Sequence, residues 1–127
     1  MEKAYCCFNS NARDFARIGK LYLDSGKCNG KQLVSVDYVL NSIKPADLVD
    51  ENSKKNDKYG YAWWLIPNYK GHSVFYARGI LGQYIVCIPD EKMIIVRLGK
   101  KREKRKGNDH PTDLYYYIDA ALEMYGK

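Results

Sequence analysis

Long hydrophobic runs are missing from the sequence: no stretch of its 127 residues approaches the length that a membrane span needs. The first ten residues, MEKAYCCFNS, lack the basic and then apolar regions of a signal peptide. No C-x-x-C pair occurs among the four cysteines, which argues against a zinc site and a thioredoxin-type motif. With 46% hydrophobic and 13% aromatic residues, the composition is that of a single globular domain over residues 1–127.

The excess of basic residues is confined to one short segment. The net charge is +6, and residues 100–106, KKREKRK, carry six bases and one acid, so the rest of the chain is close to neutral. A solvated loop between a strand and a helix is the ordinary origin of such a block. A nucleic-acid site is the alternative, and it predicts that neutral replacements at Lys104, Arg105 and Lys106 abolish binding. No RNP motif, zinc-finger spacing or glycine-rich KH loop accompanies the segment, so we expect no nucleic-acid partner.

The cysteines and histidines show no spacing typical of a catalytic or metal site. Two of the four cysteines are adjacent, and Cys87 lies in an apolar run, where we expect it to pack as a small hydrophobic residue. His72 and His110 stand in turn-like stretches, with no carboxylate or thiol at ligand spacing. We therefore predict no metal and no cofactor. An enzyme that pairs Cys28 or Cys87 with His72 would need an exposed thiol beside the imidazole, and no spacing indicates one.

Three helices are predicted, the last with a stripe of apolar residues at a period of 3.6. We expect them to begin at the caps Asn11, Ser35 and Thr112. Gly26 ends the first helix, and Pro45 stops the second. An Asn-Gly pair between these two helices predicts a small hairpin. Residues 45–58 are polar and are expected to form a loop.

The strands are grouped in the middle of the chain, and their apolar runs are continuous rather than alternating. They are predicted at residues 59–67, 71–78, 83–89 and 92–98. Continuous apolar strands are typical of a sheet that is covered on both faces. Because helices and strands are segregated along the chain, the sequence predicts an α+β fold: an antiparallel β meander packed with N-terminal helices and a C-terminal helix.

Two glycines, Gly79 and Gly82, interrupt the run FYARGILGQYIVCIPDEKMIIVRLG at residues 75–99. A β-bulge, or a kink that makes room for a neighbouring aromatic ring, is one explanation. The other is that a ligand or another backbone approaches the strand closely at this point. The residues by themselves leave both explanations open.

Four stretches, taken together and in this order, resemble the C-terminal part of the serine β-lactamase-like hydrolases. They are NARDFARIGKLYLDSGKCNGKQLVS, YGYAWW, the run over 75–99 just quoted, and a C-terminal amphipathic helix. This is the penicillin-binding-protein-like superfamily, and the likeness is to class C β-lactamases, esterases and 6-aminohexanoate-oligomer hydrolases. It covers nearly the whole chain and implies a partial β-lactamase/transpeptidase-like fold. The resemblance also implies a periplasmic or secreted location.

The resemblance implies a role for the interrupted strand. In that family a strand beside the active site carries a third motif, commonly Lys-Thr-Gly or His-x-Gly, and by position Ile80, Leu81 and Gly82 occupy it here. The family strand lines the substrate and supplies a backbone N–H to the oxyanion hole, which would lie near Gln83 in this chain. Ile80 stands where the family often has lysine or histidine.

The family's other motifs are absent, so the sequence predicts no catalytic residue in this chain. None of the six serines is followed three residues later by the lysine of S-x-x-K, and no Tyr-x-Asn or Ser-x-Asn occurs. We therefore expect a C-terminal fragment of a larger serine hydrolase, inactive alone, whose full protein acts on a small-molecule amide, lactam or ester. Loss of the N-terminal strands would uncover a sheet edge, which predicts a homodimer.

A small aromatic-rich module that binds a ligand or glycan without catalysis is the alternative function. It would use the aromatic strand YGYAWW together with Tyr76 or Tyr84. In strands, however, such rings more often belong to the core and keep a hydrogen-bonded polar tip.

Overall fold

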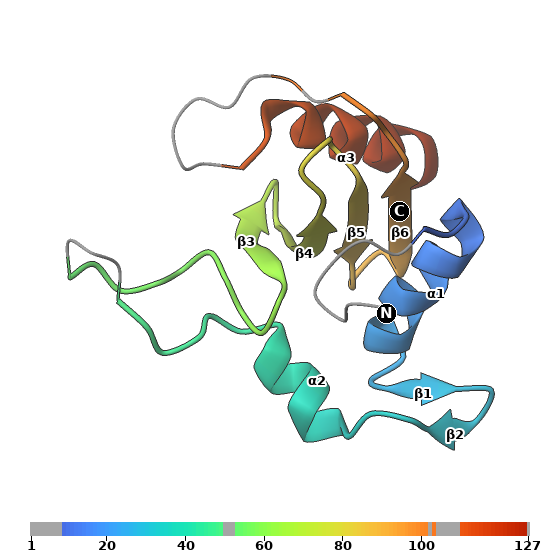
Figure 1. The fold of residues 1–127 in the computed structure, drawn as a ribbon, viewed down its shortest axis with the longest axis vertical. Coiled ribbons are helices and arrows are strands. Elements are labelled where there is room, and N and C mark those ends of the chain that lie inside the picture. The colour runs from blue at the N-terminus through green and yellow to red at the C-terminus, as the bar shows by residue number, and fades with distance from the viewer. Residues whose placement is uncertain (1–8, 50–52, 102, 104–109, 127) are drawn as a thin grey trace.

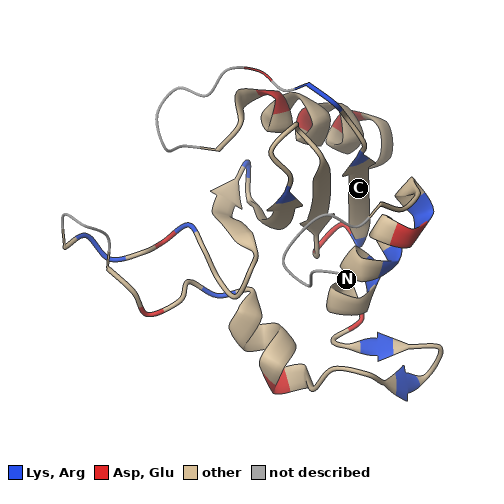
Figure 2. Cartoon of the chain, in the orientation of Figure 1, with Lys and Arg blue, Asp and Glu red and all other residues tan. Residues whose placement is uncertain are grey.

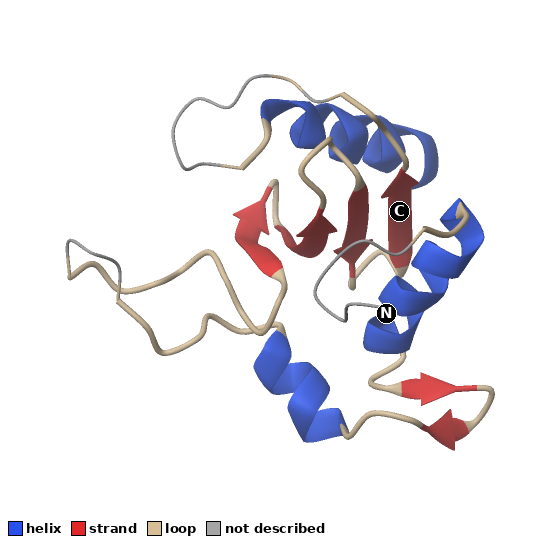
Figure 3. Ribbon diagram, viewed as in Figure 1, coloured by secondary structure: helices blue, strands red, loops and turns tan. Residues whose placement is uncertain are grey.

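The computed structural model describes residues 9–49, 53–101, 103 and 110–126, and within them three helices and two antiparallel sheets (Figure 1). The elements are α1 (Ala12–Leu23), β1 (Lys27–Cys28), β2 (Lys31–Gln32), α2 (Val36–Ser42), β3 (Trp64–Tyr69), β4 (His72–Arg78), β5 (Tyr84–Ile88), β6 (Met93–Arg97) and α3 (Thr112–Tyr125). The strands of the larger sheet follow one another between α2 and α3 (Figure 3). The α+β prediction is confirmed.

The N-terminal elements begin where local signals place them. Asn11 caps α1 by accepting a hydrogen bond from the Asp14 backbone N–H at 3.0 Å, and Ser35 caps α2 in the same way. Asn29 and Gly30 have φ values of +50° and +77° and form the turn between β1 and β2. The helix α1 ends at Leu23, and Gly26, which was predicted to end it, lies just beyond in the left-handed region, with a φ of +85° after Ser25 at +53°.

The four-stranded sheet is a meander in the order β3-β4-β5-β6, with Phe75 opposite Cys87 and Ile85 opposite Val96. One face packs on α3 through Leu114 and Ile118. The other face packs on α1 and on the residue after α2, through apolar side chains that include Phe15, Tyr22 and Ile43. All five residues of β5 are buried, since successive side chains enter opposite cores. The predicted cover on both faces is confirmed.

Two predicted boundaries differ from the structure, that of β3 by five residues and that of α3 by one. β3 begins at Trp64 rather than at residue 59, because Gly60 donates to the Trp63 carbonyl at 2.8 Å and Ala62 has a φ of +65°. Residues 60–63 therefore form a compact turn. α3 begins at Thr112 itself, so that Pro111 occupies the N-cap position and no side chain caps this helix.

The charges of the described residues are mixed in sign and scattered over α1, the loops and the ends of the sheet (Figure 2). Of the predicted basic segment, residues 102 and 104–106 lie outside the described residues. Lys100, Lys101 and Glu103 belong to neither helix nor strand and lie between β6 and α3, as expected of a loop. No helix in the described ranges is long and apolar enough to cross a lipid bilayer.

Candidate functional site

The segment predicted to line the substrate as a strand is instead the tight connection between β4 and β5. Gly79 donates its backbone N–H to the Gln83 carbonyl at 2.8 Å, and Gly82 donates to the Gly79 carbonyl at 3.2 Å. These bonds close residues 79–83 into a turn, so Ile80 and Leu81 stand outside the sheet. The placement on a strand is therefore corrected. Contact with a substrate stays a prediction.

The backbone geometry of the turn accounts for Gly82, and the side chain of Gln83 crowds Gly79. Gly82 has a φ of +82°, in the left-handed region that side chains other than glycine rarely adopt. A Cβ added to Gly79 would lie 2.3 Å from Oε1 of Gln83. The interruption is thus explained by the geometry of the turn. The bulge or kink considered from the sequence is replaced by a complete reversal of the chain.

Two side chains, those of Gln83 and Arg97, form hydrogen bonds with the polar backbone groups of the turn. Gln83 donates from Nε2 to the Gly99 carbonyl at 2.8 Å and accepts from the Leu81 N–H at 3.1 Å. Arg97, in β6, donates to the carbonyl of Gly82 and, through Nε, to the hydroxyl of Tyr117 in α3 at 2.8 Å. The side chains that the turn exposes to solvent are therefore apolar: Ile80 is 77% exposed and Leu81 is 46% exposed.

An aromatic and basic cluster, formed by Trp64, Tyr76, Arg78 and His110, lies next to this turn. The guanidinium carbon of Arg78, at the end of β4, sits 3.4 Å from the centroid of the Trp64 ring, in a cation–π contact. The hydroxyl of Tyr76 is 2.7 Å from Nδ1 of His110, the residue just before Pro111 and α3. The cluster joins β3, β4 and the start of α3.

The chemistry open to this cluster is binding rather than covalent attack. Burial raises the pKa of Tyr76, so its hydroxyl keeps its proton at neutral pH and can donate to His110. A guanidinium and an imidazole beside an apolar turn suit a ligand with an anionic or carbonyl group. A nucleophile for acyl transfer would have to come from elsewhere: Ser42, for example, is buried and donates to the Val39 carbonyl at 2.8 Å.

Tyr76 and Tyr84, which the binding-module alternative uses, are both core residues. Their exposed fractions are 0% and 2%. The Tyr84 hydroxyl donates to Asp113 in α3 at 2.9 Å, which fixes the helix against the sheet. These two rings therefore do not present a face to a ligand, in agreement with the core interpretation of strand tyrosines.

A Cys–His pair is not formed in the described part of the chain. Cys87 is fully buried between the sheet and α1, and burial raises the pKa of its thiol to about 12. Cys28 is exposed in the small hairpin. A buried thiol with a raised pKa is a poor nucleophile, so Cys87 serves as the predicted small hydrophobic residue.

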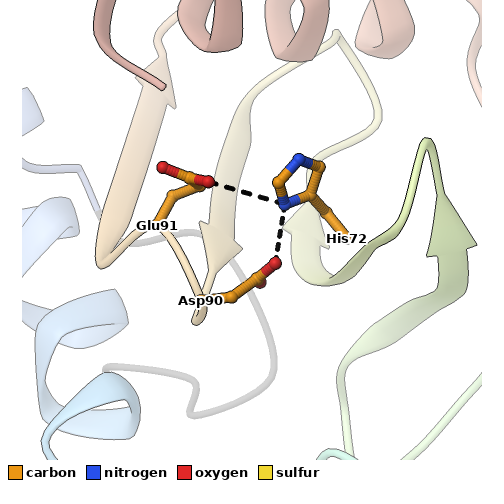
Figure 4. Close-up of side chains that lie close together, drawn as sticks. All are labelled: His72, Asp90 and Glu91. Carbon is orange, nitrogen blue, oxygen red and sulfur yellow. Dashed lines mark hydrogen bonds and ion pairs between the residues drawn. The ribbon is translucent and has the colours of Figure 1, made fainter. Parts of the chain in front are cut away.

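A second cluster was missed by sequence reasoning, which found no carboxylate at ligand spacing from His72. The structure brings Asp90 and Glu91 to that histidine (Figure 4). Nδ1 of His72 is 2.6 Å from Oδ2 of Asp90 and 3.8 Å from Oε1 of Glu91. The register of the β4–β5 pair is the signal that could have found this contact. Because Phe75 lies opposite Cys87, residue 72 falls opposite residue 90.

Comparison with solved structures finds a protein of similar fold. A solved structure described as "Putative 6-aminohexanoate-dimer hydrolase from Bacillus anthracis" shares 29% sequence identity with this chain, at a TM-score of 0.62. The match covers 89% of this chain but only 29% of that protein, so the chain spans less than a third of its length. No protein-family model matches the chain. The similarity supports a relationship to the β-lactamase and penicillin-binding-protein-like hydrolases at the level of the superfamily, and the α+β architecture is consistent with part of a β-lactamase-like fold.

Proposed function

We propose that this chain is the C-terminal part of a serine hydrolase of the β-lactamase-like superfamily. The whole protein would transfer the acyl group of a small-molecule amide, lactam or ester to water. The observation that carries this proposal is the 29% identity to a protein described as a 6-aminohexanoate-dimer hydrolase, over 89% of this chain. The name of that protein indicates an amide substrate, which fits the substrate class proposed here.

In this proposal, the serine nucleophile and the lysine base lie outside these 127 residues. No serine here has a lysine three residues on, which is the spacing that lets the lysine take the serine proton at the start of a helix. The chain would therefore be inert alone. Its part in the full protein would be to line the substrate, using the exposed side chains of Ile80 and Leu81 next to Arg78 and His110.

Acylation by a fluorophosphonate or a reactive β-lactam tests the first half of the proposal. Intact mass spectrometry of the isolated chain after incubation should show no adduct, whereas a polypeptide that also carries the region upstream should gain one adduct at a serine of that region. A stoichiometric adduct on the isolated chain would overturn the proposal, and mapping the modified residue would identify the nucleophile that it carries.

Substitution in the turn tests the second half, in the extended polypeptide. Ile80→Asn should lower kcat/KM by about tenfold, which is about 1.4 kcal/mol of transition-state stabilisation, if the turn lines the substrate. Met124→Asn is the matched control, since Met124 is a similarly exposed apolar residue on α3 (67% exposed). Equal activity of both variants and the unmodified protein would remove the turn from the substrate site while leaving the hydrolase proposal in place.

A further inference from the structure

The cluster of His72, Asp90 and Glu91 lies at the opposite end of β4 from the Gly79–Gln83 turn. His72 is the first residue of β4, and both carboxylates belong to the turn between β5 and β6. All three side chains converge on one point beside the sheet (Figure 4). Their ligand atoms lie within 4.8 Å of one another, and the fold brings them together from segments 18 residues apart.

The distances in this cluster suit a small cation. Ligands at about 2.0–2.2 Å from a tetrahedral metal are about 3.3–3.6 Å from each other. The two distances from Nδ1 of His72, 2.6 Å to Asp90 and 3.8 Å to Glu91, lie on either side of that range. A bound ion would replace the hydrogen bond between His72 and Asp90, with the Asp90 oxygen moving outward by about 1 Å and the Glu91 oxygen inward by a few tenths of an ångström. Asp90, with a half-exposed side chain, has the freedom to move.

The backbone around the cluster is already fixed, so the ligands need little ordering. Lys92 donates its N–H to the Pro89 carbonyl at 3.0 Å, which closes the turn that carries both carboxylates. Ile88, directly before this turn, is fully buried. His72 is paired with Tyr69 across the β3–β4 turn. Binding by such a preorganised set of groups costs less conformational entropy than binding by a mobile loop.

We propose that His72, Asp90 and Glu91 bind a divalent first-row transition metal, with zinc as the ion that fits best. An imidazole nitrogen with two carboxylates suits zinc, whereas calcium and magnesium favour ligand sets made of oxygen alone. Three protein ligands leave one tetrahedral position for water. The bound ion would join the β3–β4 turn to the β5–β6 turn. This proposal does not depend on the proposed acyl-transfer function.

Zinc titration of the metal-free protein tests the site. Because thiolates also bind zinc, every cysteine except Cys87 is replaced first. We would use C6S/C7S/C28S protein and keep Cys87, which is buried and whose thiol pKa is raised to about 12. Calorimetry should give one zinc per chain, with a higher melting temperature in zinc than in a chelator. His72→Gln, Asp90→Asn and Glu91→Gln should each weaken binding by about tenfold or more. Asp37→Asn, at an exposed aspartate of α2, should not.

If these variants unfold, NMR of the histidine side chains still tests the proposal in a protein that keeps His72, Asp90 and Glu91. The chain has two histidines, so a His110→Gln protein assigns the ring nitrogens of both. Zinc should shift the Nδ1 signal of His72 and leave that of His110 unchanged. A response at His110 alone, unchanged zinc affinity in folded His72→Gln and Asp90→Asn proteins, or no binding at millimolar zinc would each overturn the proposal. Calcium binding in place of zinc would overturn the choice of metal class.

Discussion

At the scale of single residues, the clearest consequence of burial concerns Cys87. Burial raises the pKa of its thiol to about 12, so far less thiolate is present at neutral pH than for an exposed cysteine. We expect iodoacetamide to alkylate Cys28 in the folded protein within minutes and to leave Cys87 unmodified. Peptide mass spectrometry after timed labelling measures both sites in one sample. In denaturant the two cysteines should react at similar rates, and similar rates in the folded protein would contradict the buried position of Cys87.

The negative charge of the Asp119 side chain affects the stability of the folded protein. Lys70 Nζ lies 2.7 Å from its carboxylate and Tyr69 donates to it at 3.0 Å, and these hydrogen bonds, that from Lys70 first, lower the pKa of Asp119. A carboxyl whose pKa is lower in the folded state stabilises the fold above the ordinary aspartate range, and that contribution is lost as the pH falls.

Asp119→Asn should therefore lower the melting temperature slightly at neutral pH, and the difference from the unmodified protein should vanish in acid. The effect is small because the pair is exposed and screened by salt. Thermal unfolding between neutral pH and acid measures it, with Asp37→Asn as the control. A difference that stays constant with pH would show that the side chain acts through packing rather than charge.

At the scale of elements, the contact between α1 and the sheet depends on Gly19. Glycine inside a helix costs about 1 kcal/mol relative to alanine, so Gly19→Ala should stabilise an isolated helix. Here, however, an added Cβ would lie 2.9 Å from Sγ of Cys87 and 3.2 Å from methyl groups of Ile85 and Ile94. We expect a net destabilisation of about 1 kcal/mol, because the helix must move away from the sheet. Urea unfolding measures it.

A double-mutant cycle separates the steric clash from other effects of this substitution. Cys87→Ala removes the nearest atom and should itself cost about 1 kcal/mol through a small cavity. In the Gly19→Ala protein, the same change should cost much less, since the new methyl group fills the space. Additive free energies of unfolding would mean that the clash is absorbed elsewhere.

An element could be predicted from the sequence where the residues that determine it lie close together in the chain. The caps Asn11 and Ser35 and the Asn29–Gly30 turn act over three residues or fewer, and all were predictable. The Gly79–Gln83 turn was placed wrongly, since a glycine pair suits both a bent strand and a reversal. The His72–Asp90 contact required the strand register, which the sequence does not supply.

At the scale of the whole molecule, the two cores share one sheet, so we propose that residues 1–127 behave as one domain. The outer strands of that sheet differ in how well their edges are protected. β3 contains Pro67 and a register shift between Ile66 and Tyr69, both of which hinder pairing with another strand. β6 is regular and half-buried, and among the described strands it pairs only with β5.

We therefore expect the isolated chain to dimerise through β6. Light scattering should show a mass that rises with protein concentration towards twice 14.7 kDa. Hydrogen exchange should slow at β6 amides as the concentration increases, while β3 amides serve as the control. A strict monomer at millimolar concentration would contradict this expectation, and slower exchange at β3 instead would move the interface to the other edge.

The meander also sets the order in which the protein can form on the ribosome. Each of the four described strands of the larger sheet pairs with a strand next to it in the chain, so these pairings need no distant segment. Short loops cost little closure entropy, and chains rich in local contacts fold faster than those with long-range pairings. Each hairpin can therefore close as soon as its second strand has left the ribosome. α3 follows these four strands in the chain and then covers one face of their meander.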